Sequence, residues 1–454
     1  MNPFIFREYD IRGVANRDLA PQQVDRLGRA LGVYFCAQNC HRIMVGRDCR
    51  LSSPAITRTL AAALAASGCE VSDIGVCPTP VLYFAVRHFG ADGGVMVTAS
   101  HNPPEFNGFK ICRGWQTIFG AEIQKLRELA EKGDCVTGSG SITQQEIIPT
   151  YLAFLQNNLR LARPLKVGLD GGHGTAGPVA RQLFEGLGCQ VFPLYCDMDG
   201  TFPAHLPDPT IPAHLGDLQR LVAEQALDVG LAYDGDGDRL GVIGPDGRIL
   251  WGDELLILFA RDILQQHPGA TIIGEVKCSQ GLYDDIAQHG GRPLMWKTGH
   301  SLIKQKMVEE QALLAGEMSG HLFFADRYFG YDDAIYASGR LVELIAQTGL
   351  SLPAMLADVP KKLATPEMRR DCPDEMKFRV IEGLKAQLQG RLPVNDLDGV
   401  RVQFPDGWGL VRASNTQPAL VLRFEADTPE RLQAIQKEIE ALLNAALKGQ
   451  GIDT

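Results

Sequence analysis

The chain has 454 residues, a length that predicts two to four domains at roughly 100–200 residues per domain. Apolar residues make up 45% and charged residues 22% of the sequence, as in most globular proteins. The 44 basic and 54 acidic residues give a formal net charge of −10, which argues against general binding to nucleic acid or to an anionic membrane. An anionic ligand would therefore require a local concentration of positive groups.

The sequence has none of the features of a membrane or exported protein. No run approaches the roughly 18 apolar residues of a membrane span, and residues 1–13 carry charges where a signal peptide needs apolar residues. We therefore expect a cytoplasmic protein. The 11 cysteines are an odd number and form no Cys-x-x-Cys pair, so we expect reduced thiols rather than a disulfide framework or a zinc site.

A strand–helix–strand pattern occurs three times along the chain. Apolar strands are expected at residues 42–48, 166–170 and 272–275. Helices are expected at 53–67, 178–186 and 280–288, and each is followed by glycine and a second strand. This order is typical of a βαβ crossover and predicts parallel or mixed sheets.

The C-terminal part differs from this pattern. Residues 400–404 and 419–426, with a turn at 405–407, predict an antiparallel sheet. Thr428 is a candidate N-cap of a helix that has Pro429 at its first position and ends at Gly449. A linker is expected around 358–375. We therefore place the domains at 1–145, 146–248, 249–360 and 365–454.

The first polar loop is Thr98-Ala99-Ser100-His101-Asn102-Pro103, which follows an apolar strand. A serine in this position suits an exposed nucleophile, but a hydroxyl needs a base or a charged partner to react. The loop lacks the Gly-x-Ser-x-Gly pattern of acyl hydrolases. A capping serine beside a turn is the structural alternative.

The second polar loop is Asp234-Gly235-Asp236-Gly237-Asp238-Arg239. Its three carboxylates alternate with glycines and can converge on one hard cation, for which we favour Mg²⁺ with a phosphate oxygen as a further ligand. Arg239 stands where an EF-hand loop requires glycine, and the expected flanking strands also exclude that motif. A solvated turn is less favoured because three unpaired carboxylates would repel one another.

Two further loops carry polar side chains suited to a sugar phosphate. In Gly316-Glu317-Met318-Ser319-Gly320-His321, the glutamate and serine can bind hydroxyl groups, and the histidine can exchange a proton. The segment Arg412-Ala413-Ser414-Asn415-Thr416-Gln417-Pro418 combines a guanidinium, hydroxyls and backbone amides in a candidate phosphate site. Either segment alone is also compatible with an ordinary turn.

A fifth segment, Gly172-His173-Gly174-Thr175-Ala176-Gly177, fits the dinucleotide-binding pattern Gly-x-Gly-x-x-Gly. Asp197 follows at the spacing of a ribose-binding acid. However, two residues separate the expected strand from the first glycine, and the repeat at 42–48 has no such glycines. Nucleotide binding is therefore the less favoured hypothesis.

Together, in this order and at these spacings, the four loops resemble the α-D-phosphohexomutase superfamily, specifically its bacterial phosphomannomutase/phosphoglucomutase branch. The resemblance begins at Tyr9-Asp10-Ile11-Arg12-Gly13 and extends to the loop at 412–418. It implies an α/β fold of four domains around a central cleft. Three related αβα domains with mixed sheets would precede a smaller antiparallel α+β domain that binds phosphate.

The resemblance also implies an isomerase that moves a phosphoryl group between C1 and C6 of mannose and glucose phosphates. Ser100 would be a phosphoserine, and a hexose 1,6-bisphosphate would reorient between two transfers, with glucose or mannose 1,6-bisphosphate as activator. Asp234, Asp236 and Asp238 would bind Mg²⁺ together with the phosphoserine. The positioning and charge stabilisation required by phosphoryl transfer fit these residue types.

Further residues take roles from the resemblance. Arg12, His101 and Lys110 would belong to the catalytic centre of the first domain, and His321, Lys110 and Arg12 remain alternative acid/base residues. The implied substrate-binding residues are Tyr9, Arg239, Lys277, His300, Glu317, Ser319, His321, Arg412, Ser414, Asn415 and Thr416. Met318 resembles the branch that accepts both mannose and glucose. We expect a fourth domain that closes on a hinge near 360–365, and a monomer or homodimer.

Three rival functions remain open. A phosphatase could use the same serine and metal but would leave the second phosphate site without purpose. A nicotinamide-dependent oxidoreductase would rely on the segment 172–177. A non-catalytic sugar-phosphate sensor would not need the nucleophile or the metal acids.

Overall fold

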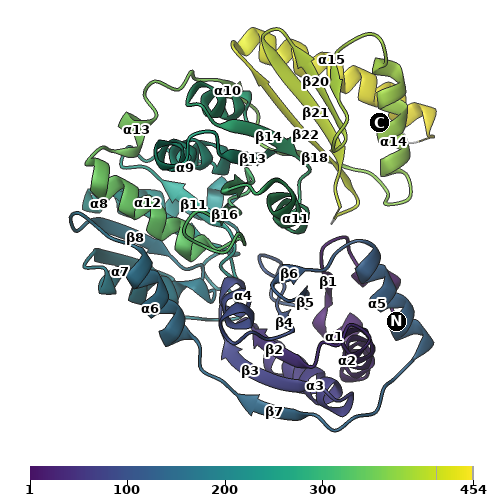
Figure 1. Cartoon of the computed structure of the whole chain (residues 1–454). Coiled ribbons are helices and arrows are strands. Elements are labelled where there is room, and N and C mark those ends of the chain that lie inside the picture. Colours follow the sequence, from purple (N-terminus) through teal and green to yellow (C-terminus); the bar gives the residue numbers. More distant parts are fainter. Residues whose placement is uncertain (416, 452–454) are drawn as a thin grey trace.

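The computed structural model describes residues 1–415 and 417–451, which form four β-sheets ordered along the chain. In Figure 1 the sheets follow one another from the lower right, through the left side, to the upper right. The N-terminal and C-terminal units therefore face each other. The expected α/β fold, with three mixed sheets followed by an antiparallel one, is confirmed.

The first sheet has parallel strands in its centre and antiparallel strands towards one edge. Its elements are η1 (Pro3–Ile5), β1 (Ile11–Val14), α1 (Ala15–Asp18), α2 (Pro21–Cys36), β2 (Arg42–Arg47), α3 (Ser53–Ala66), β3 (Glu70–Val76), α4 (Thr79–His88), β4 (Gly93–Val97), β5 (Phe106–Arg113), β6 (Gln116–Thr117), α5 (Ala121–Lys132) and β7 (Ser141–Gln144). The strand order is β1-β5-β4-β2-β3-β7, with β6 beside β5. Side chains alternate along β2, so Ile43 and Val45 pack with α2 and α3 while Met44 packs with α4 on the opposite face.

The second sheet has the order β12-β11-β10-β8-β9. Its elements are α6 (Ile148–Asn158), β8 (Lys166–Asp170), α7 (Ala176–Gly186), β9 (Gln190–Leu194), η2 (Pro212–Leu215), α8 (Gly216–Gln225), β10 (Val229–Tyr233), β11 (Leu240–Ile243) and β12 (Ile249–Leu250). The third sheet has the order β14-β13-β15-β16. Its elements are α9 (Gly252–Gln266), β13 (Thr271–Glu275), α10 (Gln280–Gln288), β14 (Arg292–Trp296), α11 (His300–Glu310), β15 (Leu314–Gly316), β16 (Leu322–Phe324), α12 (Ala334–Thr348) and α13 (Leu352–Met355).

The three mixed sheets share one topology. A central strand (β2, β8 or β13) has a parallel neighbour on each side, and an antiparallel strand follows on one of those sides. That last strand (β5, β11 or β16) forms a hairpin with the strand before it. The three predicted strand–helix–strand segments are confirmed and form the same part of each sheet.

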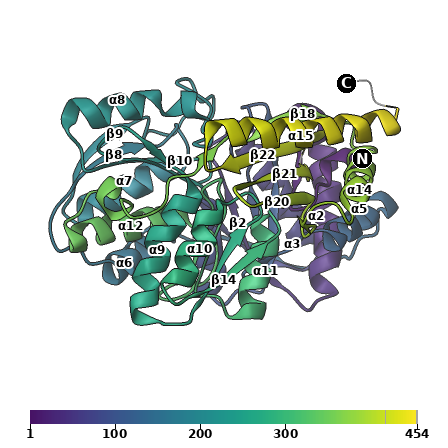
Figure 2. The same cartoon turned by 90° about the horizontal axis from the view of Figure 1, so that it is seen from above.

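The fourth sheet is antiparallel throughout. Its elements are β17 (Leu363–Ala364), β18 (Met368–Asp371), α14 (Lys377–Leu388), β19 (Val394–Asn395), β20 (Val400–Phe404), β21 (Gly407–Ala413), β22 (Ala419–Ala426) and α15 (Pro429–Gly449). The predicted cap is confirmed, because the Thr428 side chain accepts a hydrogen bond from the Arg431 amide. Ile435, Ile439 and Leu443 are buried against the sheet, along which α15 lies in Figure 2.

The four domains given above remain a proposal, with two boundaries moved by a few residues. We count β12 (249–250) with the second domain and β17 (363–364) with the fourth, because each strand pairs with that sheet. The eleven cysteines form no disulfide.

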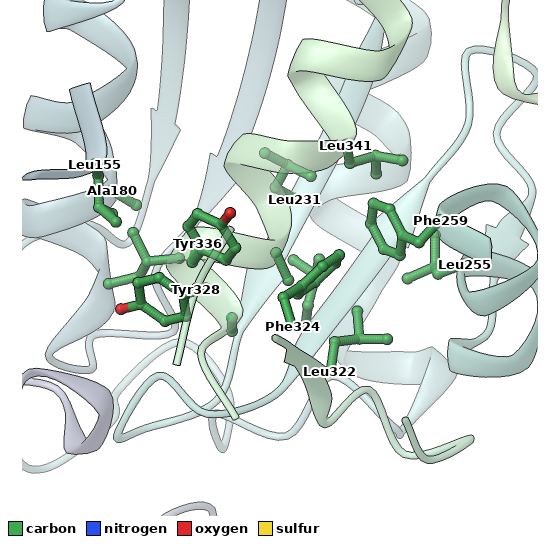
Figure 3. Close-up of a cluster of buried hydrophobic side chains, with 14 of the residues drawn as sticks. Leu155, Ala180, Leu231, Leu255, Phe259, Leu322, Phe324, Tyr328, Tyr336 and Leu341 are labelled. Carbon is green, nitrogen blue, oxygen red and sulfur yellow. The ribbon is translucent and has the colours of Figure 1, made fainter. Parts of the chain in front are cut away.

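The hydrophobic core is continuous across the first three sheets but separate in the fourth. Helix α4 packs into the same core as α6, α9 and α12. Figure 3 shows part of this core, where Phe324 of β16 lies between Phe259 of α9 and Tyr336 of α12. Among residues 1–415 and 417–451, the apolar contact between the fourth sheet and the third is one small cluster, which contains Val276 and Trp408. The fourth unit is therefore the one that can move with the least loss of apolar contact.

Candidate active site

The first three polar loops occupy the same position in three sheets. The loop at 98–105 joins β4 to β5, the loop at 234–239 joins β10 to β11, and the loop at 317–321 joins β15 to β16. In each case the chain leaves a parallel strand at its carboxyl end and returns in the antiparallel strand. This is the edge of an open α/β sheet at which ligands usually bind.

Ser100 lies in the left-handed region of the backbone, with a φ of +51°. Its Oγ donates a hydrogen bond to Asp234 Oδ2 at 2.7 Å and lies 2.9 Å from His101 Nδ1. The serine is only 3% exposed. A strained, buried serine that contacts a carboxylate of the next domain is typical of a functional position.

A buried arginine that carries no sequence motif shapes this loop. Arg50 is 1% exposed and donates to the backbone carbonyls of Ser100 at 2.8 Å and Asn102 at 2.6 Å. Its Nε donates to Asp48 Oδ2 at 3.0 Å. Arg12 contacts the same loop through the Asn102 side chain and the Ala99 carbonyl. Arg50 carries no recognisable motif and lies two residues after the strand predicted at 42–48.

The loop at 234–239 forms a cluster of buried carboxylates. Asp234, Asp236 and Asp238 are at most 1% exposed, and each offers an oxygen within 4.8 Å of the others. Among the described residues, Asp236 Oδ1 and Asp238 Oδ1 accept no hydrogen bond. Buried, unpartnered carboxylate oxygens are costly unless a cation binds them. The donor set therefore fits a hard divalent cation.

The charges around this cluster are unevenly distributed. Lys110 Nζ donates to Asp236 Oδ2 at 2.7 Å and also to Asp238 Oδ2. Burial lowers the pKa of Lys110, but attraction by the three carboxylates outweighs this effect and raises it. Burial, with repulsion from Asp238 and Asp236, raises the pKa of Asp234 well above its ordinary value. Without a metal, the carboxylate that contacts Ser100 is thus the one that favours protonation.

The loop at 317–321 packs directly on the carboxylate loop. Gly320 has a φ of +91°, and a Cβ there would lie 2.3 Å from the Leu240 carbonyl oxygen. The Leu240 amide donates to the Gly320 carbonyl at 3.0 Å. Within the loop, Ser319 Oγ donates to Glu317 Oε2 at 3.1 Å, and the other Glu317 oxygen accepts the Gly299 amide at 3.0 Å. Only glycine permits this approach of the second and third domains.

His321 is held from both sides of its ring. Arg239 Nε donates to His321 Nε2 at 3.0 Å, so this ring nitrogen carries a lone pair and no proton. His321 Nδ1 lies 3.0 Å from Asp332 Oδ2, and Lys304 Nζ donates to the other oxygen of Asp332 at 3.0 Å. The sequence prediction did not include Asp332 or Lys304, both at most 2% exposed.

A second group with metal-ligand spacing shares one residue with the first. Asp238, His321 and Asp332 offer atoms within 4.8 Å of one another. Because His321 Nε2 accepts a hydrogen bond from Arg239, the proton of this imidazole lies on Nδ1, 3.0 Å from Asp332 Oδ2, and Lys304 binds the other oxygen of Asp332. The loop with three carboxylates is therefore the candidate metal centre.

His300 stacks on His321 with ring centroids 5.5 Å apart. Its Nδ1 lies 3.7 Å from Asp332 Oδ2. Burial and the neighbouring Lys304 hold the pKa of His300 well below its ordinary value. Burial and the nearby Arg239 and Arg12 have the same effect on the pKa of His101. Both imidazoles are therefore neutral at physiological pH.

Lys277 and Tyr9 lie where the third domain meets the others. Lys277 Nζ donates to Glu367 Oε2 at 2.9 Å, which links the third domain to the fourth. Tyr9 Oη donates to the Thr298 carbonyl at 2.8 Å and accepts from Asn415 Nδ2 at 2.6 Å. Tyr9 thus connects the first, third and fourth domains.

The fourth loop joins β21 to β22. Arg412 Nε donates to Asp398 Oδ2 at 3.0 Å, and Lys377 Nζ donates to the Ser414 carbonyl at 2.5 Å. The Gln417 amide donates to Ser414 Oγ at 3.1 Å. Thr416, also predicted for this site, lies outside the described residues. Lys377, which the sequence prediction did not include, orders the loop by donating to its backbone carbonyls.

The glycines at 172–177 have a packing role. A Cβ at Gly174 would lie 2.7 Å from the Gly235 carbonyl oxygen, and a Cβ at Gly177 would lie 2.8 Å from the Cys196 backbone. Gly174 thus packs against Gly235 of the carboxylate loop. The space that a dinucleotide phosphate needs beside such glycines is thus occupied by backbone, which argues against the nucleotide hypothesis.

Four family models cover almost the whole chain. They describe phosphoglucomutase/phosphomannomutase α/β/α domains I, II and III at residues 3–135, 149–247 and 251–363, and the C-terminal domain at 367–442. The chain belongs to this phosphoglucomutase/phosphomannomutase family. The models follow the same order as the four sheets.

Known members of the family are similar over their full length. The chain is 49% identical over 442 residues to a phosphomannomutase/phosphoglucomutase of Pseudomonas aeruginosa, covering 97% of this chain and 96% of that protein. It is 42% identical over 446 residues to a phosphoglucomutase of Neisseria meningitidis, covering 97% of each. The crystal structure of a phosphoglucomutase/phosphomannomutase family protein of Burkholderia thailandensis superposes with a TM-score of 0.92 at 43% identity, over 98% of this chain and 97% of that one.

The family membership agrees with the metal centre described above, since the matched second domain contains the carboxylate loop. Within the described residues, no helix has the length and apolarity needed to cross a bilayer.

Proposed function

We propose that this chain is a hexose-phosphate mutase that interconverts the 1- and 6-phosphates of mannose and of glucose. One observation carries the proposal: Ser100 Oγ of the first domain lies 2.7 Å from Asp234 Oδ2 in the carboxylate loop of the second. This contact supports a nucleophilic role for Ser100 beside the candidate metal centre. The names of relatives similar over nearly the whole chain support the same activity.

The proposed reaction begins with a phosphoryl group on Ser100. The free hydroxyl of a hexose monophosphate attacks this phosphorus, the bond from phosphorus to Ser100 Oγ breaks, and the hydroxyl proton passes to a base. The product is a hexose 1,6-bisphosphate. In the second half, Ser100 takes the other phosphate and the proton returns to the sugar oxygen. Glucose or mannose 1,6-bisphosphate would restore the phosphoserine if it is lost.

Charge neutralisation is the main contribution of the first two domains. Asp234, Asp236 and Asp238 would hold Mg²⁺, which supplies positive charge beside the transferred phosphoryl group. Lys110 and Arg12 add positive charge from the first domain. Phosphoryl transfer depends mainly on such positioning and charge stabilisation.

His321 is the proposed base. Its Nε2 accepts a hydrogen bond from Arg239 and so carries a lone pair, and a sugar hydroxyl can replace this donor. Lys110 is engaged by two carboxylates that raise its pKa, which favours a charge-stabilising role. Arg12 contributes a guanidinium, which has only hydrogen-bond donors.

The third and fourth domains provide the proposed substrate contacts. Glu317 and Ser319 would bind sugar hydroxyls shared by mannose and glucose, with Lys277 and His300 beside them. Arg412, Ser414, Asn415 and Thr416 would bind the phosphate that is not being transferred, and Tyr9 and Arg239 would contact the ligand from the other domains.

The bisphosphate must reorient between the two transfers. Ser100 is 3% exposed, so the domains must separate before a hexose phosphate can reach it. Polar contacts such as Lys277–Glu367 and Tyr9–Asn415 dominate the contacts of the fourth domain, and water can replace them. We propose that this domain opens on a hinge near 360–365.

Phosphorus NMR tests the function directly. Mannose 1-phosphate and glucose 1-phosphate are supplied separately with Mg²⁺ and catalytic glucose 1,6-bisphosphate, and a Ser100→Ala protein is the control. We expect both 6-phosphates to form with the wild type and neither with the variant. Free phosphate without isomerisation would instead establish the phosphatase. We expect a monomer or a homodimer, and light scattering during gel filtration decides between the two.

A further inference from the structure

Glu275 is a fully buried acid at the end of β13, the central strand of the third sheet, and it is 0% exposed. Its Oε2 accepts the Lys277 amide at 2.8 Å and Thr298 Oγ1 at 2.8 Å. Its Oε1 accepts the Met318 amide at 3.3 Å. One carboxylate therefore joins three segments that are distant in the sequence.

Each of these segments carries side chains of the proposed sugar site. The first contains Lys277, the second runs from Thr298 into His300, and the third is the loop at 317–321. A buried carboxylate loses its hydration, and hydrogen bonds must compensate for that loss. Moving any of the three segments would remove a hydrogen bond from this buried carboxylate, so Glu275 favours one arrangement of the three.

The other two mixed sheets have an acid at the corresponding place. Asp48 directly follows β2 and accepts the Arg50 amide at 3.1 Å, and Asp170 ends β8 and accepts the Gly172 amide at 2.9 Å. Both acids order the turn that follows their own strand, and each also contacts one distant segment: Asp48 accepts the Ala99 amide at 3.4 Å, and Asp170 Oδ2 lies 3.2 Å from His205 Nε2. Glu275 has the longer side chain and extends from its own turn to two further segments.

Thr298 extends this network to the other domains. Its amide donates to Asp398 Oδ2 of the fourth domain at 3.0 Å, and its carbonyl accepts from Tyr9 of the first domain at 2.8 Å. Asp398 also accepts from Arg412 of the phosphate loop at 3.0 Å. The hydroxyl that contacts Glu275 thus belongs to a residue that three domains hold.

We propose that Glu275 is a positioning residue that keeps the three sugar-site segments in register and, through Thr298, couples this register to docking of the first and fourth domains. The proposal rests on the proposed mutase function. Glu275 does not itself contact substrate. It acts through Lys277, Thr298 and Met318.

Two variants separate the parts of the network. Glu275→Gln keeps the shape of the side chain. However, the NH₂ group of the glutamine must face either the Met318 amide or the other two donors, none of which can accept its hydrogens in their present contacts. Thr298→Val keeps the volume and removes the hydroxyl, whereas Thr298→Ser keeps the hydroxyl. Glu343→Gln is the matched control. Glu343 lies on α12, outside the site, and is 3% exposed. It accepts a hydrogen bond of 2.8 Å from the Arg160 amide.

The readout is KM and kcat for both 1-phosphates, together with the bisphosphate released per turnover. We expect Glu275→Gln and Thr298→Val to raise KM about tenfold, to lower kcat less, and to release more bisphosphate. Thr298→Ser should return KM to within about threefold of the wild type. Glu343→Gln should lower only the unfolding temperature.

Kinetics of Glu275→Gln that match those of Glu343→Gln would overturn the proposal and leave Glu275 a purely structural acid. If Glu275→Gln fails to fold, equal KM values for Thr298→Val and Thr298→Ser would overturn it instead. A wild type that forms no 6-phosphate would refute the mutase function rather than the role of Glu275.

Discussion

Replacement of Lys110 by methionine removes the positive charge that lies between two of the metal-site carboxylates. Nζ is 2.7 Å from Asp236 Oδ2, and the side chain is 4% exposed. At an effective dielectric constant of about 20, one such pair contributes about 6 kcal/mol. Methionine avoids the desolvation of an ammonium group, so we expect a net loss of about 3–5 kcal/mol without metal.

Magnesium should reverse much of this loss. A bound cation restores positive charge to the carboxylates, and at 100 times Kd it stabilises the folded protein by about 2.7 kcal/mol. Because the lysine no longer repels the cation, we expect Lys110→Met to bind Mg²⁺ more tightly than the wild type. The variant should therefore depend on metal for stability to a greater extent.

Thermal unfolding in EDTA and in saturating Mg²⁺ tests this reasoning. In EDTA we expect the apparent unfolding temperature of Lys110→Met to fall by roughly 6–20 °C, at about 2–4 °C per kcal/mol. Lys304→Met is the control, because Lys304 is 2% exposed and pairs with Asp332 outside the metal loop. Equal effects of Mg²⁺ on the wild type and Lys110→Met would refute the reasoning.

Three other predictions concern pH, domain docking and loop contact. Burial raises the pKa of Asp333 to about 6, above its ordinary 3.8, so folding favours the protonated acid and wild-type stability rises as pH falls through 6. Asp333→Asn lacks this gain, and urea unfolding should show its stability relative to the wild type falling by about 1.4 kcal/mol from pH 8 to pH 5; a constant difference would contradict this. Tyr9→Phe removes two hydrogen bonds between domains. Small-angle scattering should therefore give this variant a larger radius of gyration than the wild type, and a larger decrease in that radius when bisphosphate is added. Identical scattering curves for the two proteins would count against a closing domain. A Cβ at Gly235 would lie 2.4 Å from the Ser100 carbonyl oxygen, so Gly235→Ala should lower kcat about 100-fold in the NMR assay, and full activity would show that the two loops need not touch.

Local signals in the sequence predicted the elements well. The last helix has its cap at Thr428, its first residue at Pro429 and its end at Gly449, as predicted. Hydrophobic periodicity and turn residues depend on neighbours within a few positions, so they are readable without tertiary structure. The repeated strand–helix–strand segments were visible for the same reason.

The polar loops were recognisable by composition and order, and the resemblance to a family gave their residues candidate roles. The same local approach suggested a nucleotide site at 172–177. Its glycines instead allow close contact with residues such as Gly235 and Cys196, which lie far along the chain. A short motif cannot distinguish space for a ligand from space filled by backbone.

The tertiary structure alone decided which side chains meet. Lys110 contacts Asp236, which is 126 residues away. Glu275 at the end of β13 contacts Thr298, which follows β14, and Met318, which follows β15. Arg50, like Glu275, carries no motif because its partners are backbone groups of a different loop. Sequence determined three similar sheets and the chemistry of their hairpin loops, since both depend on local patterns. How the sheets pack against one another determined the site, because burial and long-range contacts set the charges and positions of these residues.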